Sequence, residues 1–207
     1  YIAIPSKVTD NDFIEKYLVR VFGPYKDFIK QWLAVYSYTN YKKLPTLILK
    51  GKRGVGKNTF AEMVAEIYKP LSQMWHGKEA NFHPEVEKKL LIADETLSDD
   101  PGQYKMLKKY SGGKLNMANH KYLRPFEVLN NMNMIILSNA TTPIYVHRDE
   151  QPSSEENNQF FVYEFPKLSG PIDTELQQKL IERLGHYVRT ELKSVFDNLN
   201  MSGKRYS

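Results

Sequence analysis

The chain has 207 residues, of which 41% are hydrophobic and 26% are charged, and these are the proportions of a globular domain with a sizeable core. It contains no cysteine, which excludes disulfides and thiolate metal sites, and its formal net charge of +5 permits a nucleic-acid partner without requiring one. No apolar run reaches the ~20 residues needed to span a bilayer, so we expect no membrane partner.

The first forty residues are predicted to form two helices. Asp10 or Asn11 is a candidate N-cap for the first helix, and Gly23 and Pro24 end it. The second helix runs to about Asn40. Each has an apolar face, formed in the first by Phe13, Tyr17, Leu18, Val21 and Phe22, and in the second by Phe28, Trp32, Leu33 and Tyr36. Residues 1–44 are therefore predicted to be a small N-terminal helical region.

Four short apolar runs follow, and each is predicted to be a buried strand. They occupy residues 47–49, 90–93, 134–137 and 160–165. Uninterrupted apolar strands that alternate with helices are typical of a parallel sheet covered on both faces. We therefore predict an α/β core with a central parallel sheet over residues 45–166, followed by a C-terminal helical segment over residues 167–207.

A glycine-rich loop follows the first strand and precedes a helix predicted from about Asn58 to Tyr68. Residues 51–59 read GKRGVGKNT and fit the P-loop pattern G-x-x-x-x-G-K-[ST] at every fixed position except the last. Backbone N–H groups of such a loop point at phosphate oxygens. We expect ATP to bind here, at the residues Gly51, Gly54, Val55, Gly56, Lys57, Asn58 and Thr59.

Three residues of this loop have specific expected roles. Lys57 bridges the β- and γ-phosphates. Asn58 stands where a Mg²⁺-binding hydroxyl is usual, and its amide oxygen is a candidate metal ligand, whereas Thr59 is expected near the α-phosphate. The alternative is a glycine-rich turn that binds nothing, and the order of strand, loop and helix argues against it.

Two further strands end on polar residues. Asp94 and Glu95 follow the second strand: Asp94 is expected to hold Mg²⁺, and Glu95 to polarise the attacking water as a general base. Asn139 follows the third strand, where it can position the same water or contact the γ-phosphate. The alternative for all three is a solvated turn. Together with the loop they predict a P-loop NTPase whose catalytic residues are Lys57, Asp94, Glu95 and Asn139.

The compact order of these three signatures resembles the superfamily 3 helicases, a branch of the AAA+ ATPases found in viruses, phages and plasmids. The loop sequence GKN-T and the stretch from His120 to Asn139 look most like the helicase domains of phage and plasmid primase–helicases. The resemblance covers about residues 45–166. It implies an ATP-dependent helicase that forms a hexameric ring on single-stranded DNA, in the cytoplasm or in the host cytoplasm if the protein is viral. It also implies an upstream primase or polymerase domain, consistent with a first residue that is not Met.

The same resemblance implies a β-hairpin within residues 111–128, with a basic tip that enters the ring channel. Lysine can pair with backbone phosphates, and histidine and tyrosine rings can stack on bases. The expected DNA-binding residues are Lys114, His120, Lys121, Tyr122 and Arg124. The alternative is a solvated basic loop, in which His120 is structural.

The resemblance is incomplete at the arginine finger. Similar phage proteins carry arginines just before the strand that follows the third signature, whereas here 155–159 reads EENNQ. Arg148, in the polar segment 147–159, is the nearest candidate, and the alternative is that it is only a surface charge. Together with Asn58 this departure favours an alternative function: a nucleotide-binding oligomerisation or DNA-clamp module that hydrolyses ATP poorly and supports the upstream domain. A metabolic P-loop kinase is a third possibility, but it leaves the basic hairpin unexplained.

Overall fold

The computed structural model describes residues 8–40, 44–75, 84–94, 102–141, 143, 159–167 and 174–201. The chain folds as two compact units. The sheet unit comprises residues 43–51 and 70–164, and the helical unit comprises residues 1–42, 52–69 and 165–207. The N- and C-terminal helices, expected as separate segments, therefore belong to one unit.

The sheet unit is built on five parallel strands in the order β2-β3-β6-β1-β7. In that order their bounds are Ser72–Trp75, Leu90–Asp94, Asn133–Ser138, Thr46–Lys50 and Phe160–Glu164. Every residue of β6 is buried, as are the first four of β1 and of β3, so both faces of the centre of the sheet are covered. The predicted α/β fold with a central parallel sheet is confirmed, and the four predicted strands are present. Strand β2 was missed because only one of its residues is buried.

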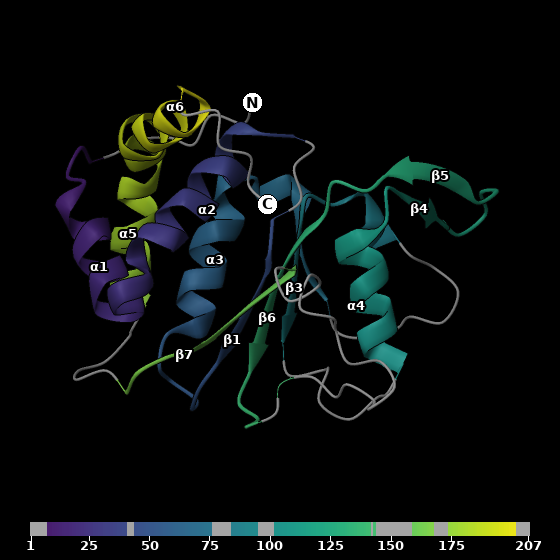
Figure 1. Cartoon of the computed structure of the whole chain (residues 1–207), viewed down its shortest axis with the longest axis horizontal. Coiled ribbons are helices and arrows are strands. Elements are labelled where there is room, and N and C mark those ends of the chain that lie inside the picture. The colour runs from purple at the N-terminus through teal and green to yellow at the C-terminus, as the bar shows by residue number, and fades with distance from the viewer. Residues whose placement is uncertain are drawn as a thin grey trace. The chain divides into compact units, whose positions relative to one another are not determined.

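One face of the sheet carries helix α4 (Gly102–Gly112) and the 3-10 turn η3 (Pro84–Glu87). Their apolar side chains form a core with the strands, composed of Ile48, Trp75, Val86, Leu91, Ala93, Leu107, Tyr110, Ala118, Met132, Met134 and Ile136. Strands β4 (Leu115–Ala118) and β5 (Phe126–Leu129) form an antiparallel hairpin that extends away from α4 (Figure 1). The hairpin implied by the family resemblance is thus present.

The helical unit consists of elements from three parts of the chain. Its elements are α1 (Asp12–Phe22), η1 (Gly23–Tyr25), α2 (Lys26–Tyr38), α3 (Lys57–Ile67), α5 (Thr174–Tyr187), the π-helical turn η6 (Val188–Leu192) and α6 (Lys193–Met201). The short turn η2 (Lys69–Leu71) follows α3. Helix α5 lies along α1, and α6 lies beside α2 (Figure 1).

Aromatic side chains join these three parts of the helical unit. The ring of Phe22 packs edge-on against Phe60, at a centroid distance of 4.8 Å, and against Phe165, at 5.3 Å. The Tyr38 hydroxyl donates to the Val188 carbonyl over 2.7 Å, and the Tyr187 hydroxyl donates to a Glu15 carboxylate oxygen over 2.8 Å.

None of the helices in the described part of the chain has the length and apolar character that crossing a membrane requires.

Lys89 is a buried cation at the amino end of β3. Its side chain is 6% exposed, its backbone N–H donates to Leu71 and its carbonyl accepts from the N–H of Asn133. Burial disfavours the charged ammonium and lowers the pKa of Lys89 from 10.5 to about 8.

The burial of Lys89 predicts a stability that rises with pH. Between pH 8 and pH 10.5 the unfolded chain binds the Lys89 proton and the folded chain does not, so the free energy of unfolding increases with pH across this window. Denaturant unfolding at pH 7, 8, 9 and 10 should show this increase in the parent and a flatter profile in Lys89→Met. Lys114→Met, which removes an exposed lysine of the same unit, should keep the parental slope. Equal profiles for the parent and Lys89→Met would contradict the prediction.

Candidate nucleotide and nucleic-acid site

The carboxyl ends of three parallel strands meet at one edge of the sheet unit. Lys50 of β1 is in register with Ser138 of β6, and Asp94 of β3 is in register with Leu137. The N–H of Gly51, the first residue of the glycine-rich loop, donates to the Ser138 carbonyl over 3.0 Å. The sheet therefore brings Asp94, Asn139 and the start of the loop to the same edge, where open parallel sheets bind ligands.

The side chains at this edge differ in their surroundings. Asp94 is partly exposed and Asn139 is exposed, so both are accessible to a ligand. Lys50 is neutralised by Glu164, with Nζ and Oε2 3.0 Å apart, and the Ser138 hydroxyl accepts from the N–H of Ala140. Lys50 and Ser138 are therefore engaged within the protein.

The rest of the loop belongs to the helical unit, where it leads directly into α3. Gly54 and Gly56 have φ angles of 83° and 92°, a left-handed conformation that side chains with a Cβ rarely adopt. Lys57 is 5% exposed, and its Nζ donates to the Lys52 carbonyl over 3.0 Å. The lysine ammonium is thus folded back onto its own loop.

Asn58 is exposed at the first turn of α3, whereas Thr59 is 9% exposed. Asn58 is therefore accessible to a metal, but it offers an amide oxygen in place of a hydroxyl. No cluster of three or more histidine, aspartate or glutamate side chains that could hold a metal occurs among the described residues. Mg²⁺ commonly takes one or two protein carboxylates and completes its shell with phosphate and water, so the predicted ligands Asp94 and Asn58 do not require such a cluster, and their role stays a prediction.

Two predicted site residues lie outside the described part of the chain. These are Glu95, the expected general base, and Arg148, the candidate arginine finger. The polar segment 147–159 lies outside it too, except for its last residue. The roles of Glu95 and Arg148 stay predictions.

The hairpin exposes most of the predicted DNA-binding residues. Lys114 lies at its base, and Lys121, Tyr122 and Arg124 lie in the connection between β4 and β5, all of them exposed. The N–H of Leu123 donates to the His120 carbonyl over 3.2 Å, which closes a tight turn. Tyr122 is 90% exposed, with Lys121 Nζ 5.1 Å from the centre of its ring. The tip thus presents one aromatic face together with two cations.

His120 differs from its neighbours because it is engaged with the protein. Its Nε2 lies 3.0 Å from a carboxylate oxygen of Glu87, and its ring stacks on Phe126 at a centroid distance of 5.9 Å and an interplanar angle of 5°. The side chain is 30% exposed. These contacts correspond to the alternative for His120, in which the side chain has a structural role. A contact between His120 and DNA stays a prediction.

Sequence reasoning did not identify Asn130, which anchors the base of the hairpin. It is 5% exposed, and its amide nitrogen donates to the carbonyls of Tyr110 and Gly113 over 2.7 and 2.9 Å. Its N–H also donates to the Lys114 carbonyl over 3.0 Å. Asn130 therefore joins the end of α4 to both strands of the hairpin. The sequence gives little sign of it, because an asparagine between two strands is ordinary turn composition.

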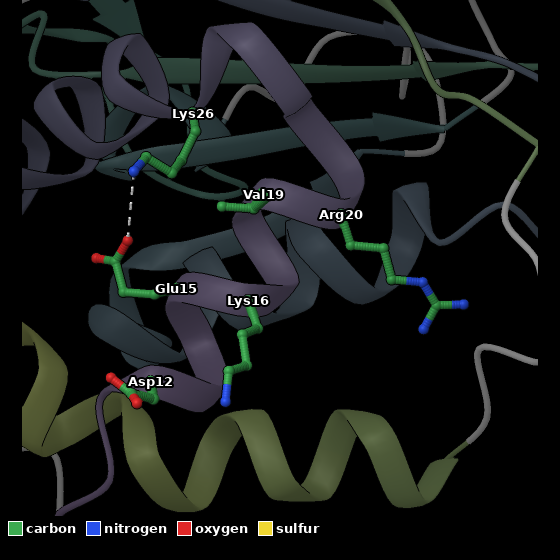
Figure 2. A pocket seen from close by; sticks show the side chains of 6 residues that line it. All are labelled: Asp12, Glu15, Lys16, Val19, Arg20 and Lys26. Carbon is green, nitrogen blue, oxygen red and sulfur yellow. Dashed lines mark ion pairs between the residues drawn. The ribbon is translucent and has the colours of Figure 1, made fainter.

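A pocket on the surface of the helical unit contains none of the predicted site residues. It is lined by Asp12, Glu15, Lys16, Val19, Arg20 and Lys26 (Figure 2). Lys26 Nζ lies 3.8 Å from Glu15, which also pairs with Lys30 and accepts from Tyr187. The acidic and basic groups neutralise one another in part, so the pocket has no clear preference for an anion or a cation.

Known proteins provide an independent comparison for this geometry. A family model described as "Family of unknown function (DUF5906)" matches residues 49–154, which include the glycine-rich loop, Asp94, the hairpin and Asn139. No curated protein matches the chain.

Several solved structures share the fold. The apo structure of the NrS-1 C-terminal region (305–718) superposes with a TM-score of 0.72 at 18% identity, over 94% of this chain and 52% of that one. A second form of this region superposes with a TM-score of 0.68 at 20% identity, over 94% of this chain and 52% of that one. JCV helicase superposes with a TM-score of 0.54 at 9% identity, over 96% of this chain and 63% of that one. The chain thus spans about half the length of the NrS-1 regions, and at these identities the similarity shows a shared fold alone.

The two buried hydrogen bonds of the Asn130 amide predict that Asn130→Ala destabilises the protein. The carbonyls of Tyr110 and Gly113 would lose their donor, at a cost of about 1–3 kcal/mol in the free energy of unfolding. Urea unfolding of the variant measures this loss, with Asn131→Ala as the neighbouring control. If both variants unfold at the parental urea concentration, Asn130 does not anchor the hairpin.

Proposed function

Because the chain belongs to DUF5906, a family of unknown function, its activity has to be inferred from the site, and we propose that it is an ATP-dependent DNA helicase domain. The observation that carries the proposal is the shared edge of the parallel sheet, where Asp94, Asn139 and the start of the glycine-rich loop lie together. The fold that the chain shares with JCV helicase supports it.

Each residue of the site has a chemical role in this proposal. Backbone N–H groups between Gly51 and Thr59 would surround the phosphates of ATP, and Lys57 would leave the Lys52 carbonyl to pair with the β- and γ-phosphates. Asp94 and Asn58 would hold Mg²⁺, which when bound neutralises charge on the phosphates. Glu95 would accept a proton from the attacking water, and Asn139 would orient that water.

The hairpin would contact single-stranded DNA. Lys114, Lys121 and Arg124 are exposed cations suited to backbone phosphates, and the exposed ring of Tyr122 is suited to stacking on a base. In this proposal the domain assembles with copies of itself into a ring, with six as the expected number. It would serve a replication protein of a phage or mobile element, behind a primase or polymerase domain, and Arg148 would be the candidate finger for a neighbouring site.

Asn58 favours a second candidate function. The residue at this position is exposed and carries an amide in place of the usual hydroxyl. A domain with weakened Mg²⁺ binding would bind ATP, oligomerise and clamp DNA while hydrolysing slowly, in support of an upstream catalytic domain. Steady-state ATPase rates with and without single-stranded DNA distinguish this clamp from a helicase.

Lys57→Ala tests the phosphate site. The variant should bind ATP at least about 100-fold more weakly, because charge-assisted hydrogen bonds contribute about 1.5–3 kcal/mol each and Lys57 would make more than one. Isothermal titration calorimetry with ATP and Mg²⁺ measures the change. Lys52→Ala is the matched control, since it removes a cation from the same loop but keeps the carbonyl that holds Lys57. Parental ATP affinity in Lys57→Ala would exclude this loop as the phosphate site.

Lys121→Ala tests the hairpin. Loss of one phosphate contact should weaken binding of single-stranded DNA and reduce the slope of log K against log salt concentration by about 0.7. Fluorescence anisotropy of a labelled oligonucleotide at several salt concentrations gives both quantities. Lys109→Ala, which removes an exposed lysine of α4, should keep the parental slope. A Lys121→Ala variant with the parental slope would show that this lysine does not touch the DNA backbone.

A further inference from the structure

The hairpin is held to the sheet unit near its tip as well as at its base. At the base, Asn130 joins β4 and β5 to the end of α4. Near the tip, His120 reaches Glu87 of η3 with a contact of 3.0 Å, and its ring lies flat against Phe126 of β5. The inner face of the hairpin also packs on this unit, because Ala118 is fully buried in the same core as Val86 of η3.

Glu87 belongs to a segment whose neighbouring residues are packed and hydrogen-bonded to the sheet. Val86 beside it is 2% exposed, and two residues later the backbone of Lys89 is hydrogen-bonded on one side to Leu71 and on the other to Asn133. Strand β3 begins at Leu90 and ends at Asp94, so the segment that contains Glu87 leads directly into the strand that carries Asp94. The contact with Glu87 therefore links the hairpin tip to the start of a central strand.

His120 also determines the shape of the tip. Its carbonyl accepts the hydrogen bond that closes the turn to Leu123, and Tyr122 between them has a φ angle of 70°. A tyrosine in this left-handed region is strained, and it keeps the conformation only where its surroundings impose it. The turn directs Tyr122 outward, to 90% exposure. The His120 carbonyl is thus part of the turn that carries Lys121 and Tyr122 at the tip.

From these contacts we propose that His120 and Glu87 form a latch that positions the hairpin tip, and that His120 acts on DNA only through Lys121 and Tyr122. The proposal rests on the DNA-binding role proposed for the hairpin. His120 is a positioning residue, because its Nε2 is engaged with Glu87 and one face of its ring is covered by Phe126.

The test is a double-mutant cycle of Glu87→Ala, His120→Ala and the double variant, read by anisotropy of labelled single-stranded DNA across a salt series. An exposed pair contributes little, so each single variant should bind DNA about two- to fivefold more weakly. The double variant should bind DNA no more weakly than whichever single variant has the lower affinity, because each substitution breaks the same contact. The salt slope should not change, because no phosphate contact is lost.

Two variants serve as controls. Glu127→Ala removes an exposed carboxylate of the hairpin that takes no part in the latch, and it should not weaken DNA binding. Glu87→Gln keeps a hydrogen-bonding side chain opposite His120 and should restore most of the affinity lost in Glu87→Ala. If Glu87 affected DNA binding only through its negative charge, Glu87→Ala would bind DNA more tightly than the parent. That is the opposite of the change expected for the latch.

A direct DNA contact by His120 would overturn the proposal, and it has a distinct signature. His120→Ala would then weaken binding while Glu87→Ala left it unchanged or tighter, or the two effects would add in the double variant. If the parent does not bind DNA, the function proposed for the hairpin fails, and the latch is tested by the same cycle on the urea midpoint. Non-additive midpoint shifts would then support the latch, and additive shifts would exclude it.

Discussion

The parallel register of β1, β3 and β6 is the constraint on which the rest of the site depends. Parallel strands paired in this register have their carboxyl ends at the same edge of the sheet. The positions of Asp94 and Asn139 therefore follow from the pairing of the strands that precede or contain them. The hydrogen bond from the Gly51 N–H to the Ser138 carbonyl extends this pairing by one residue into the glycine-rich loop. A one-residue slip of β1 against β6 would break this bond and displace the start of the loop from the polar strand ends.

The hairpin shows how a small antiparallel element is held in place on a parallel sheet. An isolated two-stranded hairpin is marginally stable in water, so it needs contacts with the rest of the protein. Here α4 supplies them through Asn130 at the base and η3 supplies them through Glu87 near the tip. The outer residues of β4, Leu115 and Met117, are exposed, while its inner residues Asn116 and Ala118 are buried. The inner face of β4 therefore anchors the hairpin, and the predicted DNA-binding residues lie in the connection and at the base.

The buried cations of the two units differ in how they are accommodated. Lys57 is buried in a loop whose own Lys52 carbonyl accepts from its ammonium, and the proposed function provides phosphate as a stronger partner. Lys89 lies at the amino end of β3, the opposite end of that strand from Asp94, where burial lowers its pKa to about 8. The first is hydrogen-bonded within its own loop, whereas burial of the second is predicted to make the stability of the fold depend on pH.

The fold class and four of the five sheet strands followed from the amino-acid sequence alone, because apolar runs are local patterns that the chain carries wherever it folds. Glycine spacing likewise predicted the loop at residues 51–59, whose phosphate-binding role stays a prediction. Strand β2 and helix α4 were not predicted: β2 has one buried residue and the apolar pattern of α4 is weak, so only contacts with the rest of the sheet unit define them. Only the tertiary structure placed His120 against Glu87, which lies 33 residues earlier, and showed that Asn130 joins α4 to the hairpin. Such contacts depend on which segments the fold brings together, and neither residue type nor local spacing encodes that.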